Sequence, residues 1–268
     1  MRYALTFLLM ATIALGQGVW PKTATVVDGG HRYDFDTLGK RSVTPSADYG
    51  NIVLWQAFSY SDNSDADFYD LSTDGNDGAQ TTAAAQPTHS TADGGVYDFD
   101  GVDDNIDCGS VATAISGQLT VAAWIRTDQA TATVVVFDGR NDSGSNAGFL
   151  MDMQTGDNIR LIIDTDAAAG ANSTGASTLS TNTWYHVAGT RDGSGVIDVY
   201  VNGSQDDATP TTLAGTMTIT DDSAIGVNTA SGAGFYDGDL DDVRIYSTAL
   251  TAAEVLAIYN NTKGTYGL

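Results

Sequence analysis

The stretch Asp237–Asn260, DGDLDDVRIYSTALTAAEVLAIYN, carries the sequence features that decide the fold. Its apolar and β-branched residues predict a strand over Asp239–Tyr246. Thr251 follows as a helix N-cap, and Glu254, three residues on, completes a Thr-x-x-Glu capping box. The apolar stripe of the helix consists of Val255, Leu256, Ile258 and Tyr259. The segment therefore predicts a strand followed by one short C-terminal helix.

Glu254 is also the only glutamate among 34 acidic residues. Retaining glycosidases use two carboxyl groups that lie about 5–5.5 Å apart. A glutamate pair is impossible in this chain, because its single glutamate already has a capping role. No Ser-His-Asp signature is present either. The sequence therefore predicts that the chain is not an enzyme, and a glycosidase reading would need a pair of aspartates.

The composition is strongly acidic, with a net charge of −23 and only 11 Lys and Arg residues. Such a charge repels nucleic acid and anionic lipid, so neither is predicted as a partner. Two readings of the aspartates stay open: a solvated surface, or short oxygen-rich loops that bind a cation. A single cysteine, Cys108, excludes an internal disulfide and is predicted to be a buried, inert thiol.

The N-terminal part divides into two segments. Residues 1–16 join Arg2 to the apolar run Tyr3–Leu15, which is too short to span a bilayer as a helix. This pattern predicts a signal peptide; the alternative is a retained segment buried against a partner. Residues 17–48 are predicted to be an extension or linker with one strand at His31–Phe35, serving as a spacer or as a docking arm.

From residue 49 to residue 262 the pattern is strand, turn, strand. The predicted strands before Asp239–Tyr246 are Asn51–Phe58, Val96–Asp100, Leu119–Ile125, Thr133–Phe137, Ile159–Ile163, Trp184–Gly189, Val196–Val201, Met217–Ile219 and Ser223–Val227. Asn202-Gly203 is a strong hairpin signal. Many short strands with Gly, Asp and Asn turns predict an all-β fold, a two-sheet antiparallel jelly-roll sandwich. Residues 263–268 are predicted to be a tail.

Several blocks in order resemble the laminin G-like, concanavalin A-like lectin/glucanase domain, in the bacterial and phage form called LamG type 3. The blocks are NIVLWQAF (51–58), DLSTDGNDG (70–78), YDFDGVDDNIDCG (97–109), LTVAAWIR (119–126), TWYHVAGTRDGSGVIDVYVNG (183–203) and GDLDDVRIYSTALTAAEVLAIYN (238–260). The resemblance spans about residues 49–261. Within these blocks, Trp124 and Trp184 are expected to fill the core between the sheets rather than to bind ligand.

The resemblance implies a calcium ion near the edge of the sandwich. The oxygen ligands available there are Asp70, Asp74 and Asn76 in an acidic loop, and Asp241 with Asp242 beside the last strand. The two groups are expected to converge if the first and last strands of the domain lie side by side. The alternative is that these residues are solvated turn aspartates. The Glu-x-Asp-x-Glu arrangement of the related laminarinase-like enzymes is missing.

The resemblance also implies carbohydrate binding, in which aromatic rings stack on sugars and polar groups hold their hydroxyls. Tyr60, Tyr69, Phe235 and Tyr236 lie in loop-like sequence and are candidates for such contacts; ordinary packing at the rim is the alternative.

Taken together, the expected protein is a secreted, extracellular, non-catalytic binding or adhesion module for a glycan or another cell-surface ligand, with structural calcium. The alternative is a structural or decoration protein of a phage virion or an extracellular filament. In that reading the first 48 residues dock on a capsid, a filament or further copies of the chain, and the sandwich faces outward on the virion surface.

Overall fold

The computed structural model describes residues 24–28, 31–35, 41–43, 52–56, 67–68, 70, 72, 74–128, 132–142, 147–167, 170–207 and 209–268 of the chain. The predicted signal segment 1–16 lies outside these residues. No helix in the described part of the chain is both long and apolar enough to cross a membrane.

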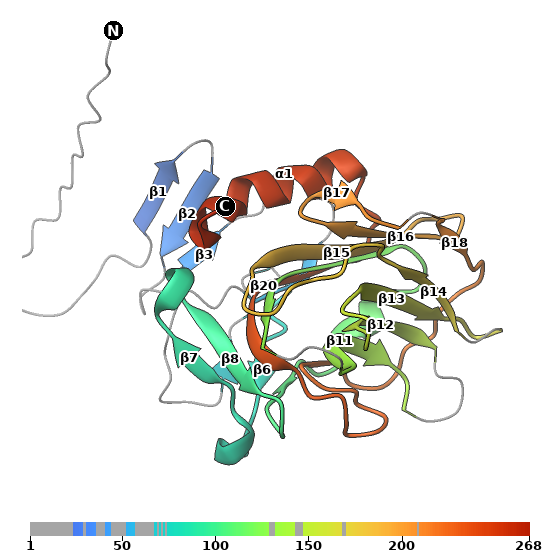
Figure 1. The fold of residues 1–268 in the computed structure, drawn as a ribbon, viewed down its shortest axis with the longest axis horizontal. Coiled ribbons are helices and arrows are strands. Elements are labelled where there is room, and N and C mark those ends of the chain that lie inside the picture. Colours follow the sequence, from blue (N-terminus) through green and yellow to red (C-terminus); the bar gives the residue numbers. More distant parts are fainter. Residues whose placement is uncertain are drawn as a thin grey trace, which may run out of the picture.

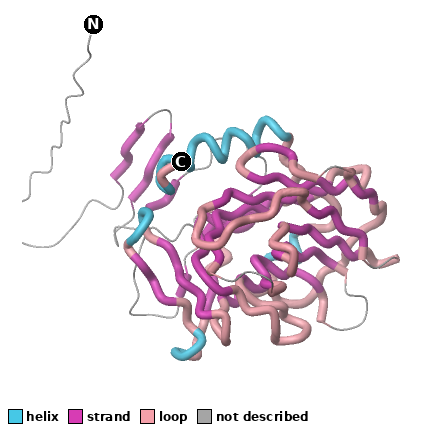
Figure 2. The backbone as a smooth tube through the Cα atoms, in the orientation of Figure 1, coloured by secondary structure: helices cyan, strands magenta, loops and turns pink. Residues whose placement is uncertain are grey.

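Two antiparallel sheets pack face to face, as Figures 1 and 2 show. The first, called the covered sheet, has β17 (Ser204–Gln205), β16 (Val196–Val201), β15 (Tyr185–Arg191), β10 (Leu119–Thr127), β20 (Asp237–Tyr246), β8 (Val96–Asp100) and β7 (Thr88–Ser90), with β18 (Thr211–Thr212) beside β16 and β4 (Ile52–Gln56) beside β20. The second, called the open sheet, has β14 (Ala171–Thr174), β13 (Ile159–Asp164), β12 (Gly148–Met153), β11 (Val134–Arg140), β19 (Ala224–Ile225), β9 (Ile106–Asp107), β6 (Gly78–Ala79) and β5 (Asp67–Phe68). The predicted antiparallel sandwich is confirmed.

The strand pattern places one core between the sheets. Inward residues include Phe99 of β8, Ile197 and Val199 of β16, and Phe149 and Leu161 of the open sheet, all buried in one cluster. Alternation along each strand puts these residues on one face, so their burial drives the two sheets together. Cys108 belongs to this cluster, and burial raises the pKa of its thiol, as expected for an inert side chain.

The other face of the covered sheet is also apolar, and the C-terminus covers it. Helix α1 (Ala252–Thr262) begins at Thr251 with the predicted capping box: the Thr251 side chain accepts from the Glu254 N–H, and the Glu254 side chain accepts from the Thr251 N–H. Val255 and Ile258 of α1 are buried in a second cluster with Trp55, Tyr200 and Tyr246. Figure 1 shows α1 lying across this sheet.

The two tryptophans expected between the sheets lie elsewhere. Trp124 and Trp184 form a third cluster on the outer face of the covered sheet, where the Trp124 ring stacks on Tyr266 at 4.0 Å. Tyr266 belongs to the 3₁₀ helix η4 (Lys263–Tyr266), in the segment predicted to be a tail. Through Tyr266, the segment predicted to be a tail thus packs against the domain. The expectation failed because β10 is buried on both faces, so its apolar content does not reveal which residue faces which layer.

One hairpin signal and two strand predictions have clear outcomes. Asn202 and Gly203 both have positive φ, 50° and 76°, in the two-residue turn between β16 and β17, as a type I′ hairpin requires. His31–Phe35 is a strand, β2, within a separate three-stranded sheet with β1 (Ala24–Asp28) and β3 (Arg41–Val43). Met217–Ile219, in contrast, is no strand, although Met217 and Ile219 are buried in the inter-sheet core.

The connections also contain three short 3₁₀ helices, η1 (Ala83–Ala85), η2 (Ala92–Gly94) and η3 (Val111–Ala114). Of these, η2 lies against the C-terminal η4. It places Asp93 next to the tryptophan cluster, where the Trp184 indole N–H donates to the Asp93 carboxylate at 3.0 Å.

Candidate functional site

The outer face of the open sheet holds a cavity of about 350 Å³, and no helix in the described part of the chain covers it. Its floor is aliphatic: Val135 of β11, Leu150 of β12 and Ile162 of β13 point away from the inter-sheet core, and Leu150 lies directly opposite Ile162 in the β-ladder. The remaining lining residues are Thr133, Arg140, Asp152, Arg160, Asn228, Ser231, Ala233 and Gly234. This size is at the lower end of the range for small-molecule sites.

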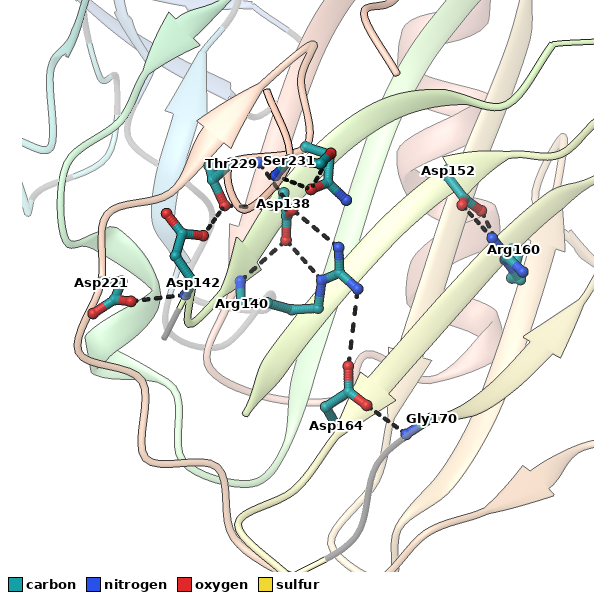
Figure 3. Close-up of polar contacts among 11 residues, drawn as sticks. Asp138, Arg140, Asp142, Asp152, Arg160, Asp164, Gly170, Asp221, Thr229 and Ser231 are labelled. Atoms are coloured by element: carbon teal, nitrogen blue, oxygen red, sulfur yellow. Dashed lines mark hydrogen bonds and ion pairs between the residues drawn. The ribbon is translucent and has the colours of Figure 1, made fainter. Parts of the chain in front are cut away.

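Two arginine–aspartate pairs stand on this floor (Figure 3). Arg160 of β13 lies opposite Asp152 of β12, and its Nε donates to Asp152 Oδ1 at 2.9 Å. Arg140 of β11 donates from Nε and from its terminal nitrogen to the two oxygens of Asp138, at 3.0 and 3.2 Å. Both are fork-like pairs, which fix the guanidinium planes as well as the charges.

Asp164 of β13 extends the row across the sheet. Its carboxylate lies 4.0 Å from the Arg140 guanidinium and also accepts from the N–H of Gly170. Burial raises the pKa of Asp152 and of Asp164, while the nearby guanidiniums oppose that effect. The two arginines face the three aspartates 138, 152 and 164, so the row has one net negative charge.

The rim of the cavity is a loop, residues 228–234, which is fastened to β11. The N–H of Thr229 donates to Asp138 at 3.2 Å, and the Thr229 hydroxyl donates to Asp142 at 2.8 Å. Within the loop, the N–H and hydroxyl of Ser231 donate to Asn228 Oδ1 at 3.0 and 2.9 Å. The rim is therefore set in place before any ligand arrives.

This site was missed in the sequence because it depends on cross-strand pairing. The segment Gly148–Met153 was not predicted to be a strand, so Asp152 had no visible relation to Arg160. The available signal was the alternation in β13, where Arg160, Ile162 and Asp164 interleave with the core residues 159, 161 and 163. Charged residues that alternate with core residues mark the face of an antiparallel strand that points away from the core.

Of the four predicted aromatic ligand contacts, Phe235 and Tyr236 lie in the part of the chain that the structure describes. Tyr60 and Tyr69 lie outside the described residues. Tyr236 is fully buried in the inter-sheet core, with its ring edge-on to Phe99. The prediction that Tyr236 stacks on a sugar at the surface is therefore wrong. Phe235 is half-buried and directly follows Gly234 of the cavity rim, without lining the cavity itself.

Of the residues predicted to bind calcium, Asp70, Asp241 and Asp242 already accept hydrogen bonds from protein donors. Strand β4 pairs with β20, as expected, and Trp55 of β4 links the two groups: its N–H donates to Asp70 at 2.8 Å and its indole N–H to Asp242 at 2.6 Å. The Asp70 carboxylate accepts three further bonds, two from Ser72 and one from the Asn76 N–H. Asp74 is exposed, and its N–H donates to Ser72.

Asp241 and Asp242 are likewise engaged. Asp242 accepts from both ends of the Arg244 fork, at 2.8 and 2.7 Å, and Asp241 accepts from the Tyr266 hydroxyl at 2.6 Å. A cation would have to displace these donors from Asp70, Asp241 and Asp242. As arranged, these three carboxylates do not fit a calcium cage, and the calcium prediction itself stays untested.

Removing calcium tests directly whether Asp70, Asp241 and Asp242 bind an ion. Because protein donors satisfy these carboxylates without an ion, the thermal midpoint is expected to be the same in excess EDTA and in millimolar calcium, within about 1 °C. A midpoint that falls by several degrees in EDTA would show that an ion stabilises the fold by mass action, and would restore the calcium prediction. Magnesium in place of calcium is the control for a general salt effect.

Two other acidic groups were not singled out in the sequence. The first group consists of Asp100, Asp103 and Asp104, whose carboxylates, among the described residues, lie close enough together to share an ion. Burial raises the pKa of Asp104 to about 6. The Asp100 carboxylate there accepts from the N–H of Val102, so it shapes the turn after β8. We assign no ion to this turn.

The second group is a row on β20, where Asp237, Asp239 and Asp241 occupy alternate positions. Such a row is what a two-carboxylate hydrolase needs on one strand. Here Asp239 forms an ion pair with Arg126 at 2.7 Å, and Asp241 is held by Tyr266. The row lies on the face of the covered sheet where η4 packs.

Comparison with known proteins gives a family model and a set of similar folds. The model described as the concanavalin A-like lectin/glucanases superfamily, of the laminin G type 3 kind, matches residues 100–256, which is more than half of the chain. No curated protein matches.

Solved structures that are similar to this chain include two toxin binding domains and one enzyme domain. The binding domain of the Paraclostridial Mosquitocidal Protein 1 has a TM-score of 0.61 at 15% identity, covering 79% of this chain and 52% of that one. The Botulinum Neurotoxin serotype G binding domain has a TM-score of 0.61 at 14% identity, covering 80% of this chain and 51% of that one. Domain 4 of an extracellular arabinanase from Geobacillus stearothermophilus, in complex with arabinotriose, has a TM-score of 0.60 at 18% identity, covering 79% of this chain and 100% of that one. This chain thus spans about half the length of the two toxin binding domains, and at these identities the likeness establishes the fold.

Proposed function

Because the chain belongs to the concanavalin A-like lectin/glucanases superfamily, we propose that it is a non-catalytic binding module that recognises a hydroxyl-rich ligand, such as a glycan, on the outer face of its open sheet. The observation that carries the proposal is the asymmetry of the two outer faces. One is buried under α1 and η4, whereas the other has a cavity with an aliphatic floor and polar walls.

The chemistry of this cavity suits sugar hydroxyls. A hydroxyl both donates and accepts hydrogen bonds, and the Arg160–Asp152 pair, both members of which line the cavity, offers both kinds of partner side by side. Arg140 adds a further donor group to the lining, while its partner Asp138 is buried below it. The aliphatic floor, Val135, Leu150 and Ile162, suits the C–H face of a sugar ring. The pairing of Arg140 and Arg160 with aspartates cancels most of their charge, which favours a neutral ligand over an anion.

The similar solved structures support a binding role for this chain but do not identify its ligand. The arabinanase domain was solved with an oligosaccharide, and the chain covers the whole of that domain. The toxin structures are binding domains. An extracellular setting for this chain is part of the same proposal.

We propose that the chain is not catalytic because the carboxylates of this site, and the single glutamate, already have structural partners. Asp138 and Asp152 are held in fork-like ion pairs, and Glu254 is held in its capping box. General acid catalysis in glycosidases needs a carboxyl group free to give up a proton to the leaving oxygen. Release of reducing sugar from any polysaccharide by the purified chain would refute this part.

A glycan array followed by a rim variant tests the site. Ala233 lines the cavity and is exposed, so Ala233→Trp should crowd the entrance without disturbing the core. We expect it to weaken binding of the glycan selected on the array by about tenfold or more, as measured by calorimetry.

The matched control is Ala253→Trp, an exposed position on α1 across the covered sheet, which should bind like the wild type. Equal affinity in the two variants would place the binding site away from the open sheet. An array without any bound glycan would remove the carbohydrate part of the proposal.

A further inference from the structure

A second cavity, of about 490 Å³, lies at one end of the sandwich. It forms where β10 begins, β15 ends and β20 ends, because Leu119 pairs with Arg191 and Thr120 pairs with Tyr246 in the covered sheet. Its lining residues are Ala114, Ser116, Gly117, Gln118, Arg191, Gly193, Gly195, Ala214, Gly215, Thr216 and Ser247. It shares no lining residue with the cavity on the open sheet.

Arg191 is the only charged residue in this lining. That is unexpected in a chain with 34 acidic and 11 basic residues. The other arginines whose side chains the structure describes, 126, 140, 160 and 244, each pair with an aspartate. Arg191 instead donates to backbone carbonyls, those of Gly117, Leu213 and Gly215, at 2.5 to 2.8 Å.

The charge of this guanidinium is therefore only partly compensated. Arg191 is 2% exposed, and its Nε has no hydrogen-bond partner. The neighbouring acid is Asp192, whose carboxylate accepts from the N–H groups of Ser194 and Val196 and so belongs to the turn that follows β15. Burial lowers the pKa of Arg191, in keeping with a cation that is poorly solvated.

We propose that this cavity binds an oxyanion, carried as a carboxylate or sulfate by an acidic saccharide. Arg191 supplies a positive potential from beneath the cavity wall, and the exposed polar side chains of Ser116 and Gln118 supply donors around it. The Thr216 hydroxyl takes no part, because it donates to the Asp166 carboxylate at 3.0 Å. Salt screens acids that lie beyond about 8 Å at physiological ionic strength, so the acidic surface farther away opposes the attraction little. Asp192, next to Arg191, and Asp166, bonded to Thr216 of the lining, lie closer and offset part of the positive potential. A partly buried cation keeps more of its field than an exposed one.

Gly117 makes the cavity testable without removing Arg191, whose three carbonyl bonds hold the surrounding loops. A Cβ placed on Gly117 meets nothing within 4 Å, so Gly117→Phe should fill the cavity and leave the backbone unchanged. Ala214→Phe, at another exposed lining position, is the second variant in case the first does not fold. Gly264→Phe in η4 is the control, because a Cβ there also meets nothing.

The measurement is an NMR titration of the full chain, read at the backbone amides of Gly117, Gly193 and Gly215. Sodium glucuronate is expected to shift them along a saturating curve, and glucose is not. Gly117→Phe or Ala214→Phe should weaken glucuronate affinity about tenfold or more, while Gly264→Phe should not change it. Sodium sulfate distinguishes the two sources: if it shifts the same amides the recognised group is the bare oxyanion, and if it does not the group is the sugar carboxylate. Shifts of equal size with glucose, no saturable shift with either anion, or unchanged affinity in both blocking variants would overturn the proposal.

Discussion

Replacing Asp242 by asparagine is expected to lower the free energy of unfolding by about 3–5 kcal/mol, as breaking a buried ion pair does. Asp242 and Arg244 are both buried, and the Arg244 guanidinium also lies over the Trp55 ring at 4.5 Å. The neighbouring carboxylate of Asp242 raises the pKa of Arg244 despite its burial, so removing that carboxylate leaves a buried cation without its partner. Asparagine keeps the shape and tolerates the φ of +51° at this position. The change removes the negative charge and replaces one accepting oxygen with a donating amide that faces Trp55 and Arg244.

Urea denaturation measures this loss, with Asp128→Asn at an exposed position as the control, expected within about 0.5 kcal/mol of the wild type. Such a loss would be a large fraction of the 5–15 kcal/mol typical of a domain. The experiment should be run in EDTA and in calcium. An equal loss in both supports the structural ion pair, whereas a loss seen only with calcium would make Asp242 a metal ligand. A loss under 1 kcal/mol in both conditions would contradict the description of the pair.

Replacing His186 by phenylalanine is expected to make the protein less sensitive to acid. His186 is fully buried beside Trp124, and burial lowers its pKa to about 3, with the Arg244 charge adding to the effect. The unfolded chain binds this proton near pH 6.5 but the folded chain does not, so its contribution to stability is present above pH 6.5 and is lost as the pH falls toward 3. Between pH 7 and pH 4.5 the loss from this one group is about 2.5 kcal/mol.

The prediction concerns the difference between variant and wild type rather than either value alone. Whatever His186→Phe costs at pH 7, it should gain about 2.5 kcal/mol relative to the wild type at pH 4.5, because phenylalanine does not titrate. Val187→Ala, the next residue and a core position without an ionisable group, should show the same deficit at both pH values. A difference between His186→Phe and the wild type that does not change with pH would mean that His186 takes up its proton in the folded state.

The fold was predictable from the sequence where its signals are local. The capping box of Thr251 and Glu254 and the turn Asn202-Gly203 each depend on residues a few positions apart, and the structure confirms them. The segment 217–219 shows the limit of a local pattern. Its residues alternate like a strand, yet side chains take the place of a partner strand: Asp166 accepts from the Thr218 N–H, and Asn141 donates to the Thr218 carbonyl.

The open-sheet cavity could not be predicted in the same way, because it is made by pairing between distant segments. Arg140 and Asp164 are brought together across two strand pairings, and the rim loop arrives from residues 228–234. Aromatic residues in loops are the usual sequence signal of a sugar site. That signal gave a wrong prediction for Tyr236, because its side chain is buried in the core. Charged side chains that alternate with core residues on β13 were the better signal.

The most direct test of the proposed function is an NMR titration of the isotope-labelled chain with the glycan selected on an array. The expected result is that the amides of Arg140, Asp152, Arg160 and Asn228 shift together along one saturating curve, while those of Ala253 and Leu256 on α1 do not move. Shifts confined to α1, or to the end of the sandwich around Arg191, would contradict binding on the open sheet.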